Sequence, residues 1–330
     1  MKRIIILLYL ILVAASCRDA VGPAEGDMPE GPFVVWFNGL SGYADAYFIE
    51  ADTVITHAWL TGEAANQIIN IQGDTFAILS SLTADLRLFS GNRLGVTDQI
   101  VYFPEGSNPY SFVFSGDTVY AALYLDNSIA VLDMLSGNII NNIITRSNPC
   151  GIEYYGGKIF VSYANLPDPS SPGGVSVYDP VIEAELYWID TGVNTNWLKI
   201  QPSGMLHCYS TTYPEINGHI TIVDPNTFQI CATVECSGAP AEAIQVGESF
   251  ISPDGWGLGG LIKYNESGDF TRVELPFAPT DLAISGNTIY ATSFAANMVY
   301  LLDSATFLVV DSLQSGGEGP QGIIAIDPSN

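Results

Sequence analysis

One pattern recurs along most of this chain, and it restricts the possible folds more than any other feature. Between Asn108 and Ile143, two apolar runs flank the turn Gly116-Asp117, and two more follow, separated by a turn that begins at Asp133. Glycine reaches backbone angles that other residues avoid, and aspartate accepts backbone N–H bonds at the start of a turn. Because the residues between the turns are mainly β-branched or aromatic, the pattern predicts four short strands joined by tight turns.

The third strand and its turn show the repetition most clearly. The segment Val131-Leu132-Asp133 returns as Val177-Tyr178-Asp179, Ile222-Val223-Asp224 and Leu301-Leu302-Asp303. A second marker opens each unit, and these opening residues are Ala65, Pro109, Pro149, Thr195, Pro240, Pro279 and Pro320. Successive openings lie roughly forty to forty-six residues apart, which is the spacing expected for the four-stranded blades of a β-propeller.

The number of units predicts seven blades. Six units are complete, whereas the segment before Ala65 supplies only three strands, expected over 33–37, 44–49 and 53–60. The segment after Pro320 supplies one strand, expected over 323–326. Together they make a seventh blade, in which the C-terminal strand joins the N-terminal blade and leaves no long free sheet edge. We therefore predict an all-β, seven-bladed β-propeller with four-stranded antiparallel blades.

The repeat unit also supports a resemblance to a known family. Units of the form Asn-Pro, apolar strand, Gly-Asp or Gly-Asn, a strand ending in Tyr, then Val-x-Val-x-Asp-x-x-Thr resemble the YVTN-type β-propeller repeats of bacterial and archaeal surface-layer-like proteins. The resemblance covers about nine-tenths of the chain, with departures at Pro202-Ser203-Gly204 and over 255–260. It implies a fold and a location more than an activity, because such propellers host many unrelated functions.

The N-terminus is expected to direct export. A basic start and a short apolar run over 4–13 are typical of a signal peptide, here 1–16, since a bilayer span needs about twenty apolar residues. Cys17 then has two interpretations: a lipidated first residue, or an incidental cysteine beside an ordinary cleavage site. We favour the bacterial lipoprotein, held in the cell envelope at the periplasmic face or the cell surface. Residues 17–31 would form the anchor and a flexible tether, and 32–330 a single propeller domain.

Charge limits the class of partner. The formal net charge is −25, and no basic stripe occurs, so nucleic acid is excluded as a direct partner. We attribute most of this acidity to solubility at a cell surface, since a cation site would be expected to carry an Asp-x-Asp-x-Asp-Gly loop, which is absent. Beyond the signal peptide no apolar run is long enough to cross a membrane, so only the lipid would attach the protein to one.

Motifs for catalysis and metal binding are not found. The sequence contains no Gly-x-Ser-x-Gly, no Gly-Lys-Ser/Thr loop and no His-Glu-x-x-His. The four cysteines outside the N-terminal segment show no Cys-x-x-Cys spacing, and we expect buried free thiols at Cys150, Cys208, Cys231 and Cys236. We expect structural roles for His57, His207 and His219. The prediction is therefore no catalytic residue, no metal site and no cofactor.

The loops point to one end of the ring as the binding face. In a propeller, the loops that join the second to the third strand and those between blades crowd one end of the channel. Three consecutive blades carry long loops there, over 165–174, 211–218 and 254–260, which predict a raised lip. Aromatic rings offer large contact area to a ligand, and the predicted binding residues are Tyr163, Trp197, Tyr213 and Trp256, with Trp36 and Tyr43 across the ring.

Two classes of function follow. We favour a non-enzymatic, monomeric, lipid-anchored ring that binds a small molecule, a glycan or a cell-envelope protein through its loop face. The alternative is an enzyme with its site in the channel, either a metal-dependent lactonase-like protein or a quinoprotein-like oxidoreductase. Convergence of Glu153, Glu242 and Asp281 on a metal in the channel would favour the enzyme, whereas an aromatic channel end without such a cluster would favour binding.

Overall fold

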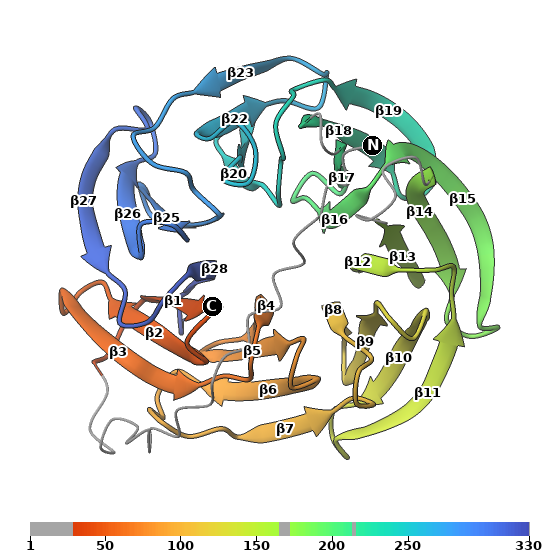
Figure 1. Ribbon diagram of the computed structural model, residues 1–330, viewed down its shortest axis with the longest axis horizontal. Helices are drawn as coiled ribbons and strands as arrows, with labels where there is room; N and C mark the ends of the chain where they lie inside the picture. Colours follow the sequence, from red (N-terminus) through yellow and green to blue (C-terminus); the bar gives the residue numbers. More distant parts are fainter. Residues whose placement is uncertain (1–28, 165–171, 213–215, 330) are drawn as a thin grey trace, which may run out of the picture.

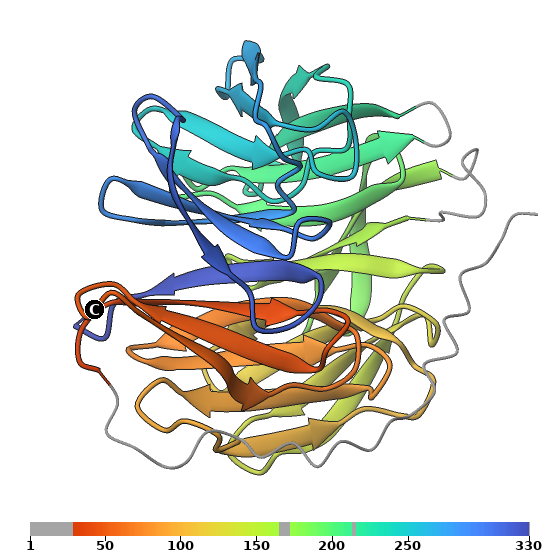
Figure 2. The same ribbon diagram turned by 60° about the vertical axis from the view of Figure 1, so that its left-hand side comes forward.

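The computed structural model describes residues 29–164, 172–212 and 216–329. In these ranges every regular element is a β-strand, and the strands form seven four-stranded antiparallel sheets. The sheets are arranged around a common centre as the blades of a ring (Figure 1), and the turned view shows them stacked side by side (Figure 2). The predicted seven-bladed β-propeller is confirmed. The described part of the chain contains no helix long and apolar enough to cross a membrane.

Six blades follow one another along the chain, each with its four strands paired in sequence order. The first three of them consist of β4 (Ala65–Gln72), β5 (Thr75–Ser80), β6 (Asp85–Ser90) and β7 (Gln99–Tyr102); β8 (Pro109–Ser115), β9 (Thr118–Leu123), β10 (Ser128–Asp133) and β11 (Asn138–Ile144); and β12 (Pro149–Tyr155), β13 (Lys158–Tyr163), β14 (Pro172–Asp179) and β15 (Ala184–Val193). The next three consist of β16 (Thr195–Ile200), β17 (Leu206–Thr212), β18 (Asn217–Asp224) and β19 (Gln229–Val234); β20 (Ile244–Val246), β21 (Ser249–Pro253), β22 (Leu261–Tyr264) and β23 (Phe270–Val273); and β24 (Asp281–Ser285), β25 (Thr288–Ser293), β26 (Met298–Asp303) and β27 (Val309–Gln314).

The seventh blade joins the two ends of the described chain, as predicted. Its strands are β28 (Pro320–Ile326), β1 (Phe33–Asn38), β2 (Tyr43–Phe48) and β3 (Thr53–Leu60), in that order. β28 pairs antiparallel with β1, so that Phe33 lies opposite Ile326 and Asn38 lies opposite Pro320. The C-terminal strand therefore closes the ring, because it completes the blade that the N-terminal strands begin.

A buried aspartate stabilises the closure of the ring through hydrogen bonds. Asp45 in β2 has no exposed surface, and its carboxylate accepts hydrogen bonds from Ser315 Oγ at 3.0 Å and from Gly316 N at 2.9 Å. It also accepts from Asn38 Nδ2 at 2.9 Å and His57 N at 2.7 Å. One side chain thus ties the N-terminal strands to the loop before β28, and each bond to an ionised carboxylate is stronger than a neutral one.

The core lies between neighbouring blades, which explains the high apolar content. The inner strands are packed on both faces, as in β1, where all six residues are buried. The outermost strands are half-exposed, as in β11, whose residues alternate between buried or half-buried and exposed positions. Trp59 of the closing blade meets Phe76 of the next blade edge-on, with 5.0 Å between ring centroids. Continuous apolar runs therefore mark inner strands of a propeller, and alternation marks outer ones.

The cysteines of the described chain are free, and one expectation about them was wrong. Cys150, Cys208 and Cys236 are buried, and burial raises the pKa of the Cys150 thiol to about 12. Cys231, which we expected to be buried, is exposed. It lies in β19, the outermost strand of its blade, where no further sheet covers the side chains. Cys17 lies outside the described residues.

Candidate functional site

The first strands of the blades line the channel, and they place charged side chains in it. Lys199 of β16, Glu153 of β12 and Asp281 of β24 line the channel cavities, together with Glu242, which lies just before β20. The ammonium of Lys199 lies 3.5 Å from Oε2 of Glu242. Although Lys199 lies deep in the ring, 43% of its side chain is exposed, because the channel is open to water. The charge of Glu242, followed by those of Glu153 and Asp281, raises the pKa of Lys199 above its usual value.

The other two carboxyl groups are held by the backbone of the next blade. Glu153 Oε1 accepts a hydrogen bond from Ile200 N at 3.2 Å, and Asp281 Oδ2 accepts one from Ile323 N at 3.0 Å. Burial raises the pKa of Glu153 and that of Asp281 to about 7 each, and the negative charge of Glu242 adds to the rise in both. Since one ammonium faces three carboxyl groups, the channel carries an excess of negative charge that protonation partly relieves.

At the end of the channel where the first strands begin, these groups open into a pocket. Its walls include two tryptophan rings, Trp197 and Trp256, and two carboxylates, Glu242 and Asp281. Three amide side chains complete the polar lining: Asn66, Gln67 and Gln321. The pocket, called the mouth pocket below, is open to solvent. Aromatic walls with a few convergent polar groups are typical of small-molecule sites.

Trp197 is held by aromatic neighbours from another blade. Its ring centroid lies 5.3 Å from that of Tyr110 in β8, and Tyr110 lies 6.0 Å from Tyr124. β12 stands between β8 and β16, but its residue at this level is Gly151, where a Cβ would come within 2.9 Å of Leu198 N. The missing side chain lets β16 approach β12 closely.

Trp256 stands on a loop that a buried aspartate organises. Asp254 is fully buried and ion-paired with Arg272 of β23. Its carboxylate also accepts hydrogen bonds from Ala239 N at 2.5 Å and from Leu258 N at 3.1 Å. These bonds fix the segment that presents Trp256, which is 50% exposed while its ring packs 5.2 Å from that of Phe294. Trp256 is therefore exposed but positioned before any ligand arrives.

Of the predicted binding residues, the structure brings Trp197 and Trp256 together and separates others from them. Tyr43 is half-buried, with its ring 4.6 Å from that of His57, and it does not line the mouth pocket. Tyr213 lies outside the described residues, as do 165–171 of the expected lip. The only one of the three lip loops that is described throughout is therefore 254–260, the loop of Trp256.

Two expected positions were wrong. Trp36 has no exposed surface, and its indole N–H donates to Ser315 Oγ at 3.1 Å inside the closing blade. Tyr163 is 4% exposed, and its hydroxyl lies 3.0 Å from that of Tyr178. Both residues lie in inner strands, β1 and β13, whose two faces are covered by adjacent blades. Nearness to a loop in sequence did not bring either ring to the surface.

The expected channel carboxylates do converge, but they surround an ammonium. In the described part of the chain, no three His, Cys, Asp or Glu side chains are grouped so as to hold one metal ion. Lys199, which stands among Glu153, Glu242 and Asp281, was missed by the sequence reasoning. One signal was present, because Lys199 follows the unit opening Thr195 by four positions, as Glu153 follows Pro149.

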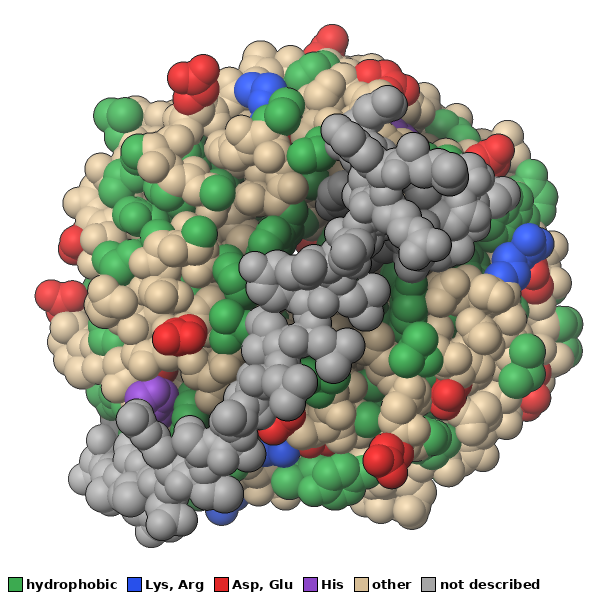
Figure 3. Space-filling view, viewed as in Figure 1, with side chains coloured by type: hydrophobic (Ala, Val, Ile, Leu, Met, Phe, Trp, Pro, Cys, Tyr) green, Lys and Arg blue, Asp and Glu red, His purple; other side chains and the backbone are tan. Residues whose placement is uncertain are grey.

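The face seen in Figure 1 agrees with the acidic composition. Acidic side chains are scattered towards its rim, Lys and Arg are sparse, and hydrophobic side chains lie between them (Figure 3). The Arg residues whose contacts are described are engaged with acids, as Arg146 is with Glu185 at 2.9 Å. The surface therefore favours cations over anions as approaching partners.

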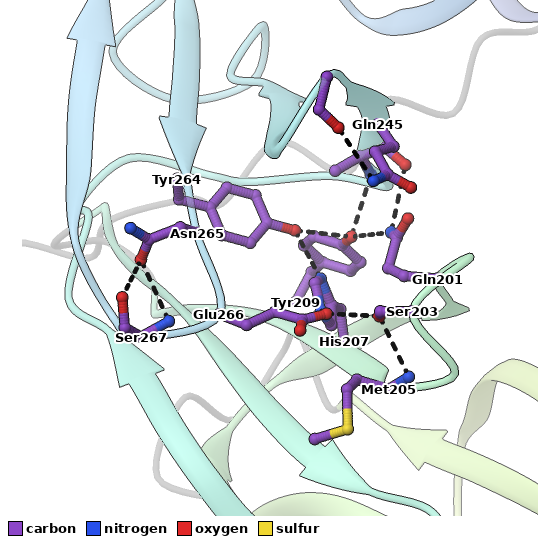
Figure 4. A network of polar contacts seen from close by, with 12 residues as sticks. Gln201, Ser203, Met205, His207, Tyr209, Gln245, Tyr264, Asn265, Glu266 and Ser267 are labelled. Carbon is purple, nitrogen blue, oxygen red and sulfur yellow. Dashed lines mark hydrogen bonds and ion pairs between the residues drawn. The ribbon is translucent and has the colours of Figure 1, made fainter.

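A second polar cluster lies between the blades of β16–β19 and β20–β23 (Figure 4). His207 is fully buried, with Nδ1 2.8 Å from the hydroxyl of Tyr264 and Nε2 3.2 Å from Oε1 of Glu266. Tyr264 continues to Tyr209 at 3.2 Å, and Ser203 donates to Glu266 at 2.5 Å. Burial lowers the pKa of His207 to about 4. This cluster satisfies buried polar groups, which agrees with the structural role expected for His207.

Comparison with known proteins supports the fold. No protein-family profile matches the sequence, and no curated protein matches it. Among solved structures, hydrazine synthase of Kuenenia stuttgartiensis is similar with a TM-score of 0.66 and 14% identity, over 79% of this chain and 89% of that one. AztD of Citrobacter koseri has a TM-score of 0.60 and 13% identity, over 90% and 98%. An inactive variant of virginiamycin B lyase from Staphylococcus aureus, solved with quinupristin, has 0.63 and 13%, over 88% and 92%. At these identities the likeness shows a shared β-propeller fold.

Proposed function

We propose that this protein is a binding protein that takes a small molecule into the mouth pocket. The observation that carries the proposal is that Trp197 and Trp256, from adjacent blades, line one pocket with Glu242 and Asp281. Large aromatic surfaces supply contact area, and a few fixed polar groups supply orientation, which is the usual division of work in a ligand site.

The contacts that hold the Trp256 loop favour a binding role for this loop over a purely structural one. Trp256 is half exposed, although the loop that carries it is held by the buried Asp254 and by Arg272. A side chain that is rigid and exposed loses little conformational entropy when a ligand covers it. The loop thus uses buried hydrogen bonds to keep an apolar ring at the surface, which a purely structural loop does not require.

We further propose the setting in which the ring works. The repeat pattern suggests a YVTN-type lipoprotein of the bacterial cell envelope, anchored through Cys17. The described chain enters the ring at Phe33, opposite Ile326, whereas Gln321 at the start of β28 lines the mouth pocket. A tether that precedes Phe33 therefore starts at the end of the ring opposite to the pocket. On this proposal the mouth pocket would face away from the anchoring membrane.

A second candidate is an enzyme that acts in the channel. The observation in its favour is that Glu153 and Asp281 both have a pKa raised to about 7, mainly by burial. Strongly shifted carboxyl groups in a cleft are frequent among catalytic acids and bases. Against this, both groups accept hydrogen bonds from the backbone of the next blade, which gives them a structural task. A binding function also accounts for the two tryptophan rings that line the mouth pocket, so we favour binding over catalysis.

The test is a thermal-shift screen of the whole protein against sugars, amines, organic acids and nucleosides. A ligand present at about a hundred times its Kd stabilises the folded state by about 2.7 kcal/mol. We expect a stabilising compound whose effect is lost in both Trp197→Ala and Trp256→Ala. Tyr102→Ala is the matched control, because Tyr102 is an exposed aromatic residue of the outer strand β7. Stabilisation that survives both tryptophan variants would overturn the proposal, and turnover of the compound would favour the enzyme.

A further inference from the structure

The mouth pocket has a distinctive balance of charge. Among the described residues that line it, Glu242 and Asp281 are acidic and none is Lys or Arg. The cation that faces these acids is Lys199, deeper in the channel, and it is shared among Glu242, Glu153 and Asp281. Even with Lys199 counted, carboxyl groups outnumber ammonium groups. A ligand that enters the pocket therefore meets negative electrostatic potential from the channel beneath the pocket.

The aromatic walls favour the same sign of charge. The face of an aromatic ring carries negative potential, and tryptophan attracts cations most strongly. This protein uses that interaction elsewhere, where the guanidinium of Arg146 lies 4.3 Å from the ring centroid of Trp188. In the mouth pocket, the rings of Trp197 and Trp256 stand beside carboxylates, which is the combination that holds alkylammonium groups in proteins.

We infer that the ligand of the mouth pocket is an organic cation, with its ammonium group between the tryptophan rings and the carboxylates of Glu242 and Asp281. The inference rests on the proposed function, since it names the ligand class of the same pocket. The alkyl or aryl part of the ligand covers the rings, and the amides of Asn66 and Gln321 accept or donate hydrogen bonds at its polar end.

Other ligand classes fit less well. An organic acid would bring a further negative charge beside Glu242 and Asp281, and the negative charge of these groups repels it. A neutral sugar would bond to the amides and stack on the rings, but it would leave the excess of negative charge uncompensated. The whole protein, with a formal net charge of −25, also attracts cations and slows anions on approach.

Lys199 gives the inference its sharpest consequence. Its ammonium competes with that of the ligand for Glu242. Lys199→Met removes the competitor and is expected to tighten binding of a cation about tenfold or more, whereas Glu242→Gln is expected to weaken it by about tenfold. A merely structural role for the Lys199–Glu242 pair predicts that both variants weaken binding alike.

The experiment is calorimetric titration of the whole protein with tetramethylammonium, choline and benzyltrimethylammonium. Choline has a neutral isostere of the same shape, 3,3-dimethylbutan-1-ol, in which carbon replaces the charged nitrogen. We expect choline to bind at least about tenfold more tightly than this isostere, with the difference reduced by about 0.5 M salt, by Glu242→Gln and by Trp256→Ala.

The outcomes separate this inference from the proposed function. Equal affinity for choline and its isostere, lost in Trp256→Ala, would overturn the cationic class and keep the pocket as the site. The cationic class is overturned in the same way if sugars or organic acids bind through Trp256 and none of the three cations does. If neither the cations nor the compounds of the thermal-shift screen bind, both the inference and the proposed function are overturned.

Discussion

The ammonium of Lys199 lies 3.5 Å from a carboxylate oxygen of Glu242, and this pair joins two adjacent blades inside the channel. It stands with Glu153 and Asp281, whose carboxyl groups both have a pKa raised to about 7 by burial and by the charge of Glu242. The single ammonium of Lys199 thus interacts with three carboxyl groups. The charge state of the channel therefore depends on pH near neutrality, and carboxyl groups rather than imidazole rings are responsible for that dependence.

The first prediction concerns pH and stability. A carboxyl group whose pKa is about 7 in the folded protein and about 3.9 when unfolded binds more protons when folded. Its contribution is fully present below about pH 4 and is lost as the pH rises towards 7. We therefore expect Asp281→Asn to gain stability relative to the natural protein between about pH 5 and pH 8, by on the order of 3 kcal/mol at most.

Urea unfolding at pH 5, 6, 7 and 8 measures this difference. The asparagine keeps an acceptor oxygen for Ile323 N, so the blade contact is largely preserved. Glu248→Gln is the control, because Glu248 is exposed in the turn between β20 and β21 and should show no trend. A stability difference between Asp281→Asn and the natural protein that stays constant across this range would contradict the prediction.

The second prediction concerns the loop that carries Trp256. Asp254→Ala leaves Arg272 without its acid and leaves the amides of Ala239 and Leu258 without an acceptor. Breaking such a buried pair by removing one partner costs about 3–5 kcal/mol. We expect a loss of that size in the free energy of unfolding, together with a loss of ligand binding at the mouth pocket.

The same urea titration and the binding assay check both effects. Asp126→Ala is a matched control, since Asp126 is exposed on the corresponding loop of another blade and should change stability by less than about 0.5 kcal/mol. Trp256→Ala should lose binding with little change in stability. Unchanged binding in a folded Asp254→Ala protein would show that the loop does not need this support.

The third prediction concerns closure of the ring. Asp45→Ala removes the acceptor for Ser315 Oγ, for Gly316 N and for two groups of its own blade. Because Asp45 is fully buried and four donors lose their common acceptor, we expect a loss of about 3 kcal/mol or more. Asp117→Ala, in the exposed turn between β8 and β9, serves as the control. Equal midpoints for the two variants in urea would contradict a role for Asp45 in closure.

Much of this architecture was predictable because a propeller repeats its local chemistry. The turns after Val131-Leu132-Asp133 and its copies mark each third strand, and the incomplete ends of the chain predict the shared blade. The phase of each unit also predicts which residues of first strands line the channel, as it did for Glu153 and Asp281. These features could be predicted because they are set by residues that lie close together in the sequence.

What the sequence did not reveal depends on contacts between residues far apart in the chain. Trp36 and Trp256 are both tryptophans near loops, yet one is fully buried and the other is half exposed. The difference comes from the packing of adjacent blades, which no local pattern contains. The pairing of Asp254 with Arg272, on a later strand of the same blade, was hidden for the same reason, although it decides where Trp256 stands.

The fourth prediction concerns the buried His207, where the sign of the pH effect is opposite. Burial lowers the pKa of His207 to about 4, against about 6.5 in the unfolded chain, even though Glu266 beside it favours the charged form. The unfolded state therefore binds more protons between these values, so the stabilising contribution is present above about pH 6.5 and is lost as the pH falls to about 4. We expect the natural protein to lose up to about 3 kcal/mol from this group over that range.

His207→Gln isolates the effect, because glutamine does not titrate. The variant should be less stable than the natural protein at pH 7, where Tyr264 and Glu266 lose well-placed partners, and it should lose less stability on acidification. His57→Asn is the control: His57 is exposed in β3 at a φ of 54°, a backbone conformation that asparagine tolerates. Urea unfolding at pH 7, 6, 5 and 4 gives the slopes. If His207→Gln and the natural protein lose stability in parallel as the pH falls, His207 does not cause the loss of stability in acid. The carboxyl groups of the channel cannot cause that loss either, because their stabilising contribution increases as the pH falls through the same range.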